Sequence, residues 1–136
     1  MNRFFPSLVL LTIFVSPAAM AQKFDLKASI ERGKEVYASY CTTCHMEQGE
    51  GIESVFPPLA KSDYLMADKK RSIHQVINGV SGEIKVNKVV YNGEMLGIDL
   101  TDEEVSDVLN YVRNSFGNKG EAVTPNEVNG VRKTLK

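Results

Sequence analysis

The chain has 136 residues, which is enough for one folded domain but short for two. Its 16 Lys and Arg residues and 17 Asp and Glu residues leave a formal net charge of −1 at pH 7, so it lacks the basic excess typical of nucleic-acid-binding proteins. We therefore expect no nucleic-acid partner. The chain has no tryptophan and only 8% aromatic residues, so we expect another group to fill part of its core.

The first 21 residues have the features of a cleavable export signal. A positively charged start precedes a mostly apolar run over 4–19, and Ala19-Met20-Ala21 supplies the small residues that signal peptidase recognises. An apolar run of about 18 residues could also anchor a chain in a membrane. The two prolines in this run and the cleavage site favour removal. We expect residues 1–21 to be a signal peptide and Gln22 to begin a chain without stable membrane insertion.

Helical spacing of apolar residues predicts a first helix from about Lys27 to Tyr40. Gly33 lies within it, where glycine costs about 1 kcal/mol relative to alanine, so we expect another backbone or helix to pack closely there. A short helical turn over 62–67 and a helix over 68–78 follow, and Gly79 is the predicted stop of the second.

Two further segments are expected to be non-helical. The prolines of Phe56-Pro57-Pro58-Leu59 disfavour helix, so this segment is predicted to be extended or turned. Ile84-Lys85-Val86 and Val89-Val90-Tyr91 flank Asn87-Lys88. Asparagine tolerates the positive φ that a two-residue turn requires, so the pattern predicts a small β-hairpin.

The last long helix has the clearest start signal of the sequence. Thr101 and Glu104 form a capping box, and Leu100 and Val105 are placed as a hydrophobic staple. Gly117 is the predicted stop. The apolar stripe between start and stop consists of Val105, Val108, Leu109, Val112 and Phe116.

A second capping box follows at Thr124-Pro125-Asn126-Glu127 and predicts a short helix that ends near Lys133. The sequence has no internal repeat. We therefore expect one domain over residues 22–120 and a C-terminal tail with a short helix over 121–136.

Cys41 and Cys44 are the only cysteines, and His45 follows the second. Cys-x-x-Cys-His is the signature of covalent haem attachment, because two thiols about one helical turn apart can form thioethers with one porphyrin and hold the adjacent imidazole under the iron. A thioredoxin-like pair requires a strand before the motif, and a structural zinc site requires four ligands. A simple disulfide leaves His45 unexplained. We predict one haem c, held by Cys41 and Cys44, with His45 as the proximal iron ligand.

From this motif outward, residues 30–118 resemble the class I cytochromes c. The segment from Gly33 to Tyr37 occupies the place of a small and an aromatic residue on that family's N-terminal helix. Val108, Leu109 and Tyr111 occupy corresponding places on its C-terminal helix. The resemblance implies an all-α cytochrome c fold in which helices from the two ends cross around one covalent haem. The hairpin before the last helix is similar to that of small bacterial members.

The resemblance also implies two further site residues. The Pro57 carbonyl, with Pro58 as the alternative, would accept a hydrogen bond from Nδ1–H of His45 and orient its ring. Met95 would be the distal iron ligand on the loop before the last helix, and its thioether would raise the reduction potential. The family usually has proline after this methionine, whereas this chain has Leu96-Gly97.

Other residues that could carry chemistry have simpler explanations. His74 is expected to be a surface histidine rather than an iron ligand or base, and Met66 lies on the wrong connection for the distal ligand. Lys69-Lys70-Arg71 is expected to face water at a helix start, with a docking patch as the alternative. Tyr91 and Tyr111 could each pack in the core or hydrogen-bond a haem carboxylate.

Together these patterns predict an exported, periplasmic single-haem cytochrome that carries electrons between redox proteins and is not itself an enzyme. With His45 and Met95 on both axial positions, the iron offers no site for a substrate. Two alternatives remain open. The chain could be a redox subunit of a larger oxidoreductase, since its end is similar to cytochrome subunits of periplasmic dehydrogenases and nitrite reductases. It could also be a ligand-binding or peroxidatic haem protein if Met95 detaches.

Overall fold

The structure is a computed structural model that describes residues 23–135. Its first element is helix α1 (Leu26–Tyr40), which begins one residue before the predicted start. The carboxylate of Asp25 accepts a hydrogen bond from the N–H of Ala28 at 3.1 Å, which satisfies a donor that a helix start leaves free. The predicted signal peptide over 1–21 lies outside the described residues.

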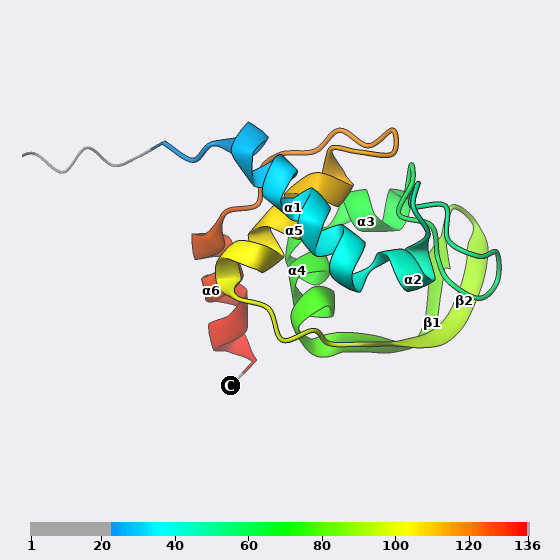
Figure 1. Ribbon diagram of the computed structural model, residues 1–136. Helices are drawn as coiled ribbons and strands as arrows, with labels where there is room; N and C mark the ends of the chain where they lie inside the picture. Colours follow the sequence, from blue (N-terminus) through cyan, green and yellow to red (C-terminus); the bar gives the residue numbers. More distant parts are fainter. Residues whose placement is uncertain (1–22, 136) are drawn as a thin grey trace, which may run out of the picture.

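Helix α5 (Asp102–Arg113) packs against α1 in the middle of the molecule (Figure 1). The two helices touch most closely at Gly33, where a Cβ atom would lie 1.9 Å from the backbone oxygen of Asp107 and 2.9 Å from Cβ of Tyr111. Only a hydrogen fits there. The glycine that lowers the helix propensity of α1 is therefore what allows α5 to approach.

A buried polar network holds α1, α5 and the segment before the last helix together. The carboxylate of Asp107 accepts hydrogen bonds from Ser29 Oγ at 2.5 Å and from Arg32 Nε at 2.6 Å. Asn110 Nδ2 donates to Ser29 Oγ and to the Val123 carbonyl, each at 2.8 Å, and Asn110 Oδ1 accepts from the Val123 N–H at 2.7 Å. Buried polar groups are costly without partners, so this network favours one arrangement of the three segments.

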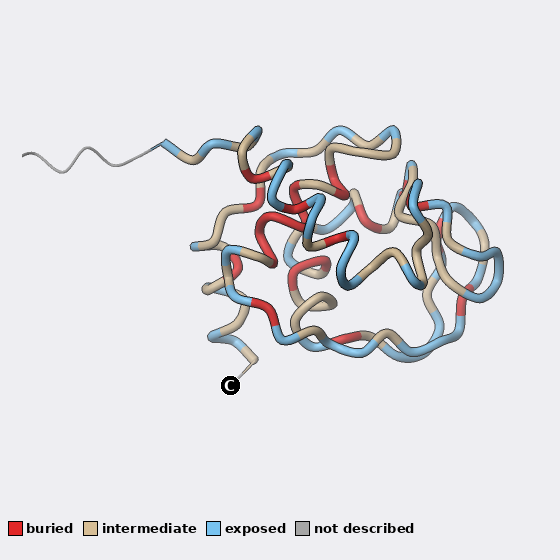
Figure 2. Tube along the Cα trace, viewed as in Figure 1, coloured by how far each residue is buried: buried red, intermediate tan, exposed pale blue. Residues whose placement is uncertain are grey.

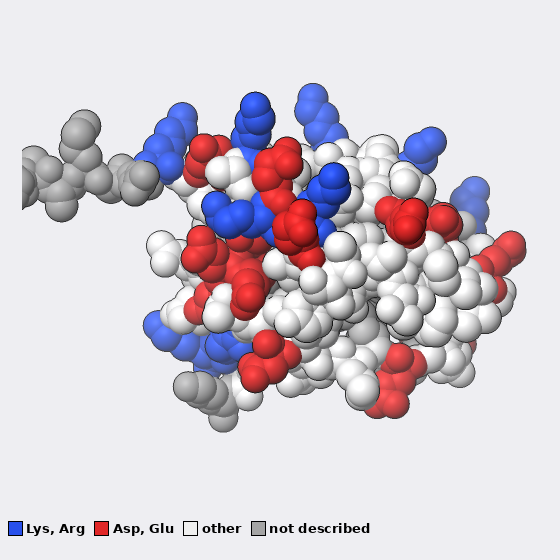
Figure 3. All heavy atoms as spheres, in the orientation of Figure 1, with Lys and Arg blue, Asp and Glu red and all other residues white. Residues whose placement is uncertain are grey.

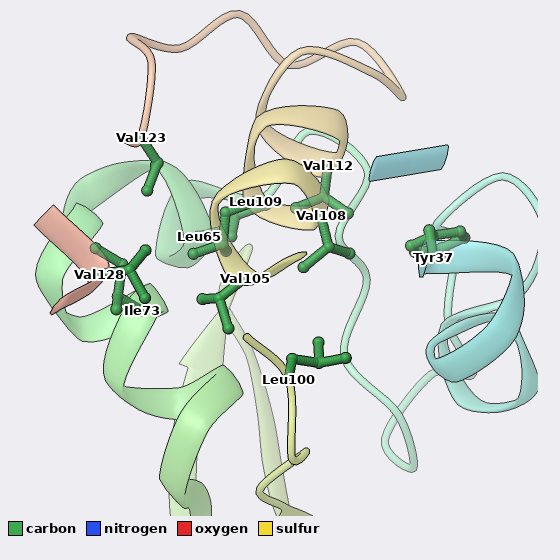
Figure 4. Packing of buried hydrophobic residues seen from close by; sticks show 10 residues of the cluster. All are labelled: Tyr37, Leu65, Ile73, Leu100, Val105, Val108, Leu109, Val112, Val123 and Val128. Atoms are coloured by element: carbon green, nitrogen blue, oxygen red, sulfur yellow. The ribbon is translucent and has the colours of Figure 1, made fainter. Parts of the chain in front are cut away.

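The hydrophobic core lies around α5 and extends to α6 (Pro125–Thr134). Figure 2 shows the buried residues concentrated there. Val123 and Val128 are fully buried, so the C-terminal segment after residue 120 packs on the core through these two side chains. The cluster in Figure 4 consists of Tyr37, Leu65, Ile73, Leu100, Val105, Val108, Leu109, Val112, Val123 and Val128.

α5 ends at Arg113, earlier than the predicted stop at Gly117. Phe116 and Gly117 have φ values of 56° and 81°, which are left-handed and cannot continue a helix. The chain instead turns back, and the ring of Phe116 packs against those of Tyr37 and Tyr111, with all centroid distances at 5.4 Å. Tertiary aromatic packing therefore overrides the helical periodicity at this end.

Three shorter helices complete the helical part: α2 (Thr42–His45), α3 (Asp63–Ala67) and α4 (Lys69–Asn78). Ser62 and Asp68 cap α3 and α4, because each side chain accepts a hydrogen bond from a backbone N–H of the first turn. Of the helices in the described range, none is long and apolar enough to cross a bilayer.

The start of α4 corrects the expectation that Lys69, Lys70 and Arg71 simply face water. Lys69 Nζ donates to the Ala122 carbonyl at 3.0 Å, and the guanidinium of Arg71 lies 3.7 Å from the ring centroid of Tyr64. Lys70 is exposed. Two of the three basic side chains therefore connect structural elements, which a local charge pattern cannot reveal.

The predicted hairpin is present and longer than expected. β1 (Gly79–Val86) and β2 (Val89–Leu96) pair antiparallel, and both residues of the 87–88 turn have positive φ, at 50° and 72°. This turn sets a register that continues to the far end and places Met95 opposite Val80. Met95 is therefore in a strand rather than in the expected loop. The fold is therefore mainly helical, as expected, and contains this one two-stranded sheet in the described part of the chain.

Gly33→Ala should lower the free energy of unfolding by about 1–3 kcal/mol or more, because the new methyl group would overlap the backbone of α5. Gly130→Ala is the matched control, since a Cβ atom at this position of α6 meets nothing within 4 Å. This control should stabilise the protein by up to about 1 kcal/mol. Urea unfolding of the haem-bound proteins measures both. Equal effects of the two substitutions would contradict the close α1–α5 contact.

Asp102→Asn should weaken the docking of α6, because the Asp102 carboxylate accepts hydrogen bonds at 2.7 Å from both Asn129 Nδ2 and Arg132 Nε. These two bonds lower the pKa of Asp102, so its stabilising effect is present above the unfolded pKa of about 3.9 and disappears as the pH falls through the folded value. We expect a loss of about 1 kcal/mol at pH 7.

In urea unfolding at about pH 2, the difference between Asp102→Asn and the parent should be smaller than at pH 7, because the carboxylate loses its charge as the pH falls through its lowered folded pKa. Asp99→Asn, at an exposed carboxylate just before α5, is the control and should have little effect at either pH. A difference that stays constant with pH would show that the charge of Asp102 does not hold α6.

Candidate functional site

A cavity of about 510 Å³ lies between the hairpin, the loop before α3 and helices α2 to α5. This volume is within the range of about 300–1,000 Å³ typical of cofactor sites. Most of the lining is apolar. The apolar side chains include Phe56, Pro58, Leu59, Leu65, Val76, Val80, Ile84, Val86, Ile98, Val108, Leu109 and Val112.

Cys41, Cys44 and His45 all line this cavity, at the junction of α1 and α2. The Cys41 carbonyl accepts hydrogen bonds from the Cys44 N–H at 3.2 Å and the His45 N–H at 2.9 Å. α2 ends at His45 because Met46 has a φ of 63°, and Tyr37 Oη donates to the Met46 carbonyl at 2.6 Å. One short helical turn therefore presents two thiols and an imidazole to the same space.

The imidazole of His45 is held by the loop before α3. His45 Nδ1 lies 2.9 Å from the Pro57 carbonyl oxygen, so the contact is at Pro57 and not at the alternative, Pro58. A carbonyl can only accept, so Nδ1 carries the proton and Nε2 keeps its lone pair. Burial lowers the pKa of His45, and the Pro57 bond partly offsets this effect. A neutral imidazole with a free Nε2 is the form that binds metals.

Gly51 is a structural requirement of this contact that the sequence analysis missed. Its φ is 63°, and a Cβ atom there would lie 2.3 Å from the Phe56 carbonyl oxygen. The Gly51 N–H also donates to the His45 carbonyl at 3.0 Å. The glycine thus lets the loop pass close enough for Pro57 to reach His45. The sequence signal was the pair of glycines in Gly49-Glu50-Gly51, which by itself does not show which segment packs against them.

The two cysteines do not have the electrostatics of a redox dithiol. Both are free thiols in the described part of the chain. Burial, followed by the nearby Cys44, raises the pKa of the Cys41 thiol to about 11. Catalytic thiols of the thioredoxin type have lowered pKa values, because the thiolate is the nucleophile. The raised pKa of Cys41 therefore argues against a thioredoxin-like role for this pair.

Met95 lines the same cavity from β2. Its backbone is held by strand pairing and by close backbone approaches at the open end of the hairpin. A Cβ atom at Gly79 would lie 2.4 Å from the Met95 carbonyl oxygen, and one at Gly97 would lie 2.4 Å from that of Ile77. The Ile98 N–H donates to the Val76 carbonyl at 2.9 Å. The strand end is thus fixed to α4 although no proline follows Met95.

The cavity wall has a polar corner formed by Tyr64 and Gln75, which sequence analysis did not single out. Gln75 Nε2 donates to Tyr64 Oη at 2.8 Å, which leaves the Tyr64 hydroxyl hydrogen available to a third group. The guanidinium of Arg71 stacks on the Tyr64 ring, and Arg71 Nε is buried without a hydrogen-bond partner in the described chain. No periodicity or motif connects these residues. The corner can receive an acceptor, such as a carboxylate.

The remaining sequence candidates lie elsewhere. Tyr91 lines the cavity, whereas Tyr111 joins the aromatic cluster with Tyr37 and Phe116. His74 borders a second, smaller cavity of about 350 Å³ on the outer side of the hairpin ends. Met66 packs against the core. Within residues 23–135, no group of three or more His, Cys, Asp and Glu side chains is arranged to hold a metal ion.

These residues fit haem c. The site offers two thiols for thioether bonds, an imidazole with a free Nε2, a thioether on the hairpin and apolar walls. The chain has two cysteines and two histidines, but His74 lies on α4 beside the second cavity, so the described residues do not gather the four ligands of a closed zinc site.

Comparisons with known proteins give the same answer. The family model described as Cytochrome c matches residues 30–116. The chain is 37% identical to cytochrome c-552 of Thermus thermophilus over 90 residues, which cover 62% of this chain and 68% of that protein. It is 31% identical to the cytochrome c subunit of alcohol dehydrogenase (quinone) of Gluconobacter oxydans over 105 residues, or 75% of this chain and 22% of the subunit.

A third relative is the cytochrome c subunit of gluconate 2-dehydrogenase of Pantoea cypripedii, 27% identical over 126 residues. This match covers 90% of this chain but 29% of the subunit, so the chain spans less than a third of the length of either dehydrogenase subunit. The segment that the family model matches extends from α1 to the end of α5 and contains all residues that line the cavity. The chain therefore belongs to the cytochrome c family, and it carries covalently bound haem c and transfers electrons.

Proposed function

We propose that this protein is an exported single-haem electron carrier that passes electrons between redox proteins and catalyses no reaction of its own. Cys41 and Cys44 attach the haem, His45 is the proximal iron ligand and Met95 the distal one. Residues 1–21 act as a signal peptide that directs the chain to the periplasm. The observation that carries the proposal is the single cavity lined by all four of these side chains.

Each residue has a separate task in this proposal. Pro57 accepts the Nδ1–H of His45, which fixes the ring orientation and makes Nε2 more basic. Met95 supplies a soft sulfur that favours ferrous iron. When bound, the haem supplies a one-electron iron couple. The apolar wall excludes water, and Tyr64 and Gln75 offer hydrogen-bond donors to the haem carboxylates.

We also propose that the close contact at Gly33 is the crossing of the two terminal helices that characterises the family. It is supported by the extensive packing of α1 against α5 and by the lack of space for a Cβ atom at this point. The crossing would hold the haem-attachment turn at the end of α1 against the cavity wall formed by α5. The domain would then comprise residues 22–120, with residues 121–136 packed on it through Val123 and Val128.

A second candidate is a bound redox subunit of a larger oxidoreductase. It is favoured by the similarity to cytochrome c subunits of alcohol dehydrogenase (quinone) and gluconate 2-dehydrogenase. Both candidates use the haem in the same way. They differ in whether the protein dissociates from the protein that supplies its electron. Purification from native membranes and periplasm separates them, because a free carrier elutes alone and a subunit elutes with a dehydrogenase.

Covalent attachment predicts that haem stays with the polypeptide through denaturing electrophoresis and acid–acetone extraction. Haem staining of the gel should be positive for the wild type and blank for Cys41→Ala/Cys44→Ala. Met95→Ala is the matched control and should stain normally, since it removes an iron ligand without touching the thioethers. Clean extraction of haem from the wild type would overturn the proposal.

Ligation by Met95 predicts that the reduced wild-type protein is low-spin, nearly inert to carbon monoxide at neutral pH and rapidly oxidised by a high-potential acceptor. Met95→Ala should bind carbon monoxide quickly and have a lower reduction potential, because the distal position opens and the sulfur is lost. Stopped-flow mixing measures the rates of carbon monoxide binding and of oxidation, and a redox titration measures the reduction potential. Met66→Ala, in the core, is the control and should keep the wild-type spectrum.

Fast carbon monoxide binding by the wild type, together with slow oxidation, would instead support a ligand-binding haem protein. An unchanged spectrum and potential in Met95→Ala would show that another residue is the distal ligand.

A further inference from the structure

Three large apolar side chains are exposed at the border of the haem cavity. Tyr40 and Val55 are each 54% exposed and Leu96 is 73% exposed, and all three also line the cavity. We call these residues the apolar rim. They come from the end of α1, the loop before α3 and the end of β2. The bound haem would cover the part of each side chain that faces the cavity, and the outward part would form an apolar border around the haem site, as is typical of interaction surfaces.

Among charged residues, the chain segments that contain Val55 and Leu96 have acidic ones only, with Lys61 directly after the first segment and Lys88 directly before the second. The segments 41–60 and 89–100, which contain most of the rim, have five acidic residues and no Lys or Arg, although the chain as a whole is nearly neutral. All five are exposed. We call them the acidic collar: Glu47, Glu50, Glu53, Glu94 and Asp99.

The acidic collar is not neutralised within the described part of the chain. The ion pairs there involve other carboxylates, at the α1–α5 contact and around α6, and none from the collar. On the hairpin, Lys85 and Lys88 lie toward the turn, at the opposite end from Leu96. Figure 3 shows a largely uncharged area on the right half of the molecule, with acidic side chains within its upper part and at its right and lower edges and basic ones along the upper edge, including the upper right.

We propose that the apolar rim and acidic collar form the docking site for a redox protein whose own surface has an apolar centre surrounded by Lys and Arg. This inference rests on the proposed function, since docking matters only if electrons leave through the cavity border. Opposite charges would speed the encounter and orient the partner, and the apolar rim would exclude water from the contact. An acidic partner would be repelled by the collar.

Tris(phenanthroline)cobalt(III) is a suitable probe, because it is an apolar-faced trication that accepts one electron and becomes cobalt(II). Ferricyanide, an anion, is its counterpart. We expect the rate at which the reduced protein is oxidised by the cobalt complex to fall, and the rate with ferricyanide to rise, between about 10 mM and about 300 mM ionic strength, as the screening length drops from about 30 Å to well below 10 Å.

Glu53→Lys/Glu94→Lys should slow oxidation by the cobalt complex at least about threefold at low ionic strength and accelerate oxidation by ferricyanide. Glu31→Lys/Glu121→Lys is the matched control, with the same change in net charge at exposed positions outside the collar, and should change both rates less than about twofold. Leu96→Thr and Val55→Thr should each lower the rate of oxidation by the cobalt complex at high ionic strength, where charges are screened and apolar contact remains. Val55→Thr tests the apolar rim on a segment that does not carry Met95.

Equal effects of collar and control substitutions, or faster oxidation by ferricyanide at low ionic strength, would overturn the docking proposal. If both oxidants oxidise the reduced protein but the collar substitutions change neither rate, the electron-transfer function is supported and the docking proposal is wrong. If neither oxidant reacts, or haem staining is blank, the proposed function itself fails. Unchanged visible spectra of all variants show that the haem environment is intact.

Discussion

The close contact of α1 and α5 at Gly33 is the constraint on which the rest of the site depends. α1 carries the two cysteines at its end, and α5 forms one wall of the cavity, so their separation sets the width of the space between them. The missing side chain permits the contact, and the buried network around Asp107 makes it specific, because other arrangements would leave buried polar groups unpaired. The same network reaches Val123 and thereby includes the C-terminal segment.

The opposite side of the cavity depends on a different kind of constraint. A two-residue turn sets the register of the hairpin, and a slip of one residue would turn Met95 to the other face of the strand. The close backbone approaches at Gly79 and Gly97 attach the open end of the hairpin to α4. These contacts fix the position of the strand end that carries Met95.

The site and its surroundings combine two electrostatic environments. Inside the cavity, burial lowers the pKa of His45 and raises the pKa of the Cys41 thiol, so it favours the neutral form of both side chains. Outside, the acidic collar leaves negative charge beside an apolar rim. The first environment favours axial ligation, and the second favours brief contact with a basic partner.

The sequence by itself determined the features that depend on neighbouring residues: the haem motif, the capping boxes of α5 and α6, and the hairpin turn. Pro57 and Met95 were singled out by the resemblance to class I cytochromes c and not by local pattern. Tertiary structure alone decided what depends on distant segments: the burial of Val123 and Val128, the early end of α5 at its aromatic cluster, and the Tyr64–Gln75 corner. The reason is physical. Capping and turn geometry act within a few residues, whereas contacts of this kind join residues from 11 to 81 positions apart and exist only once the segments that carry them have met.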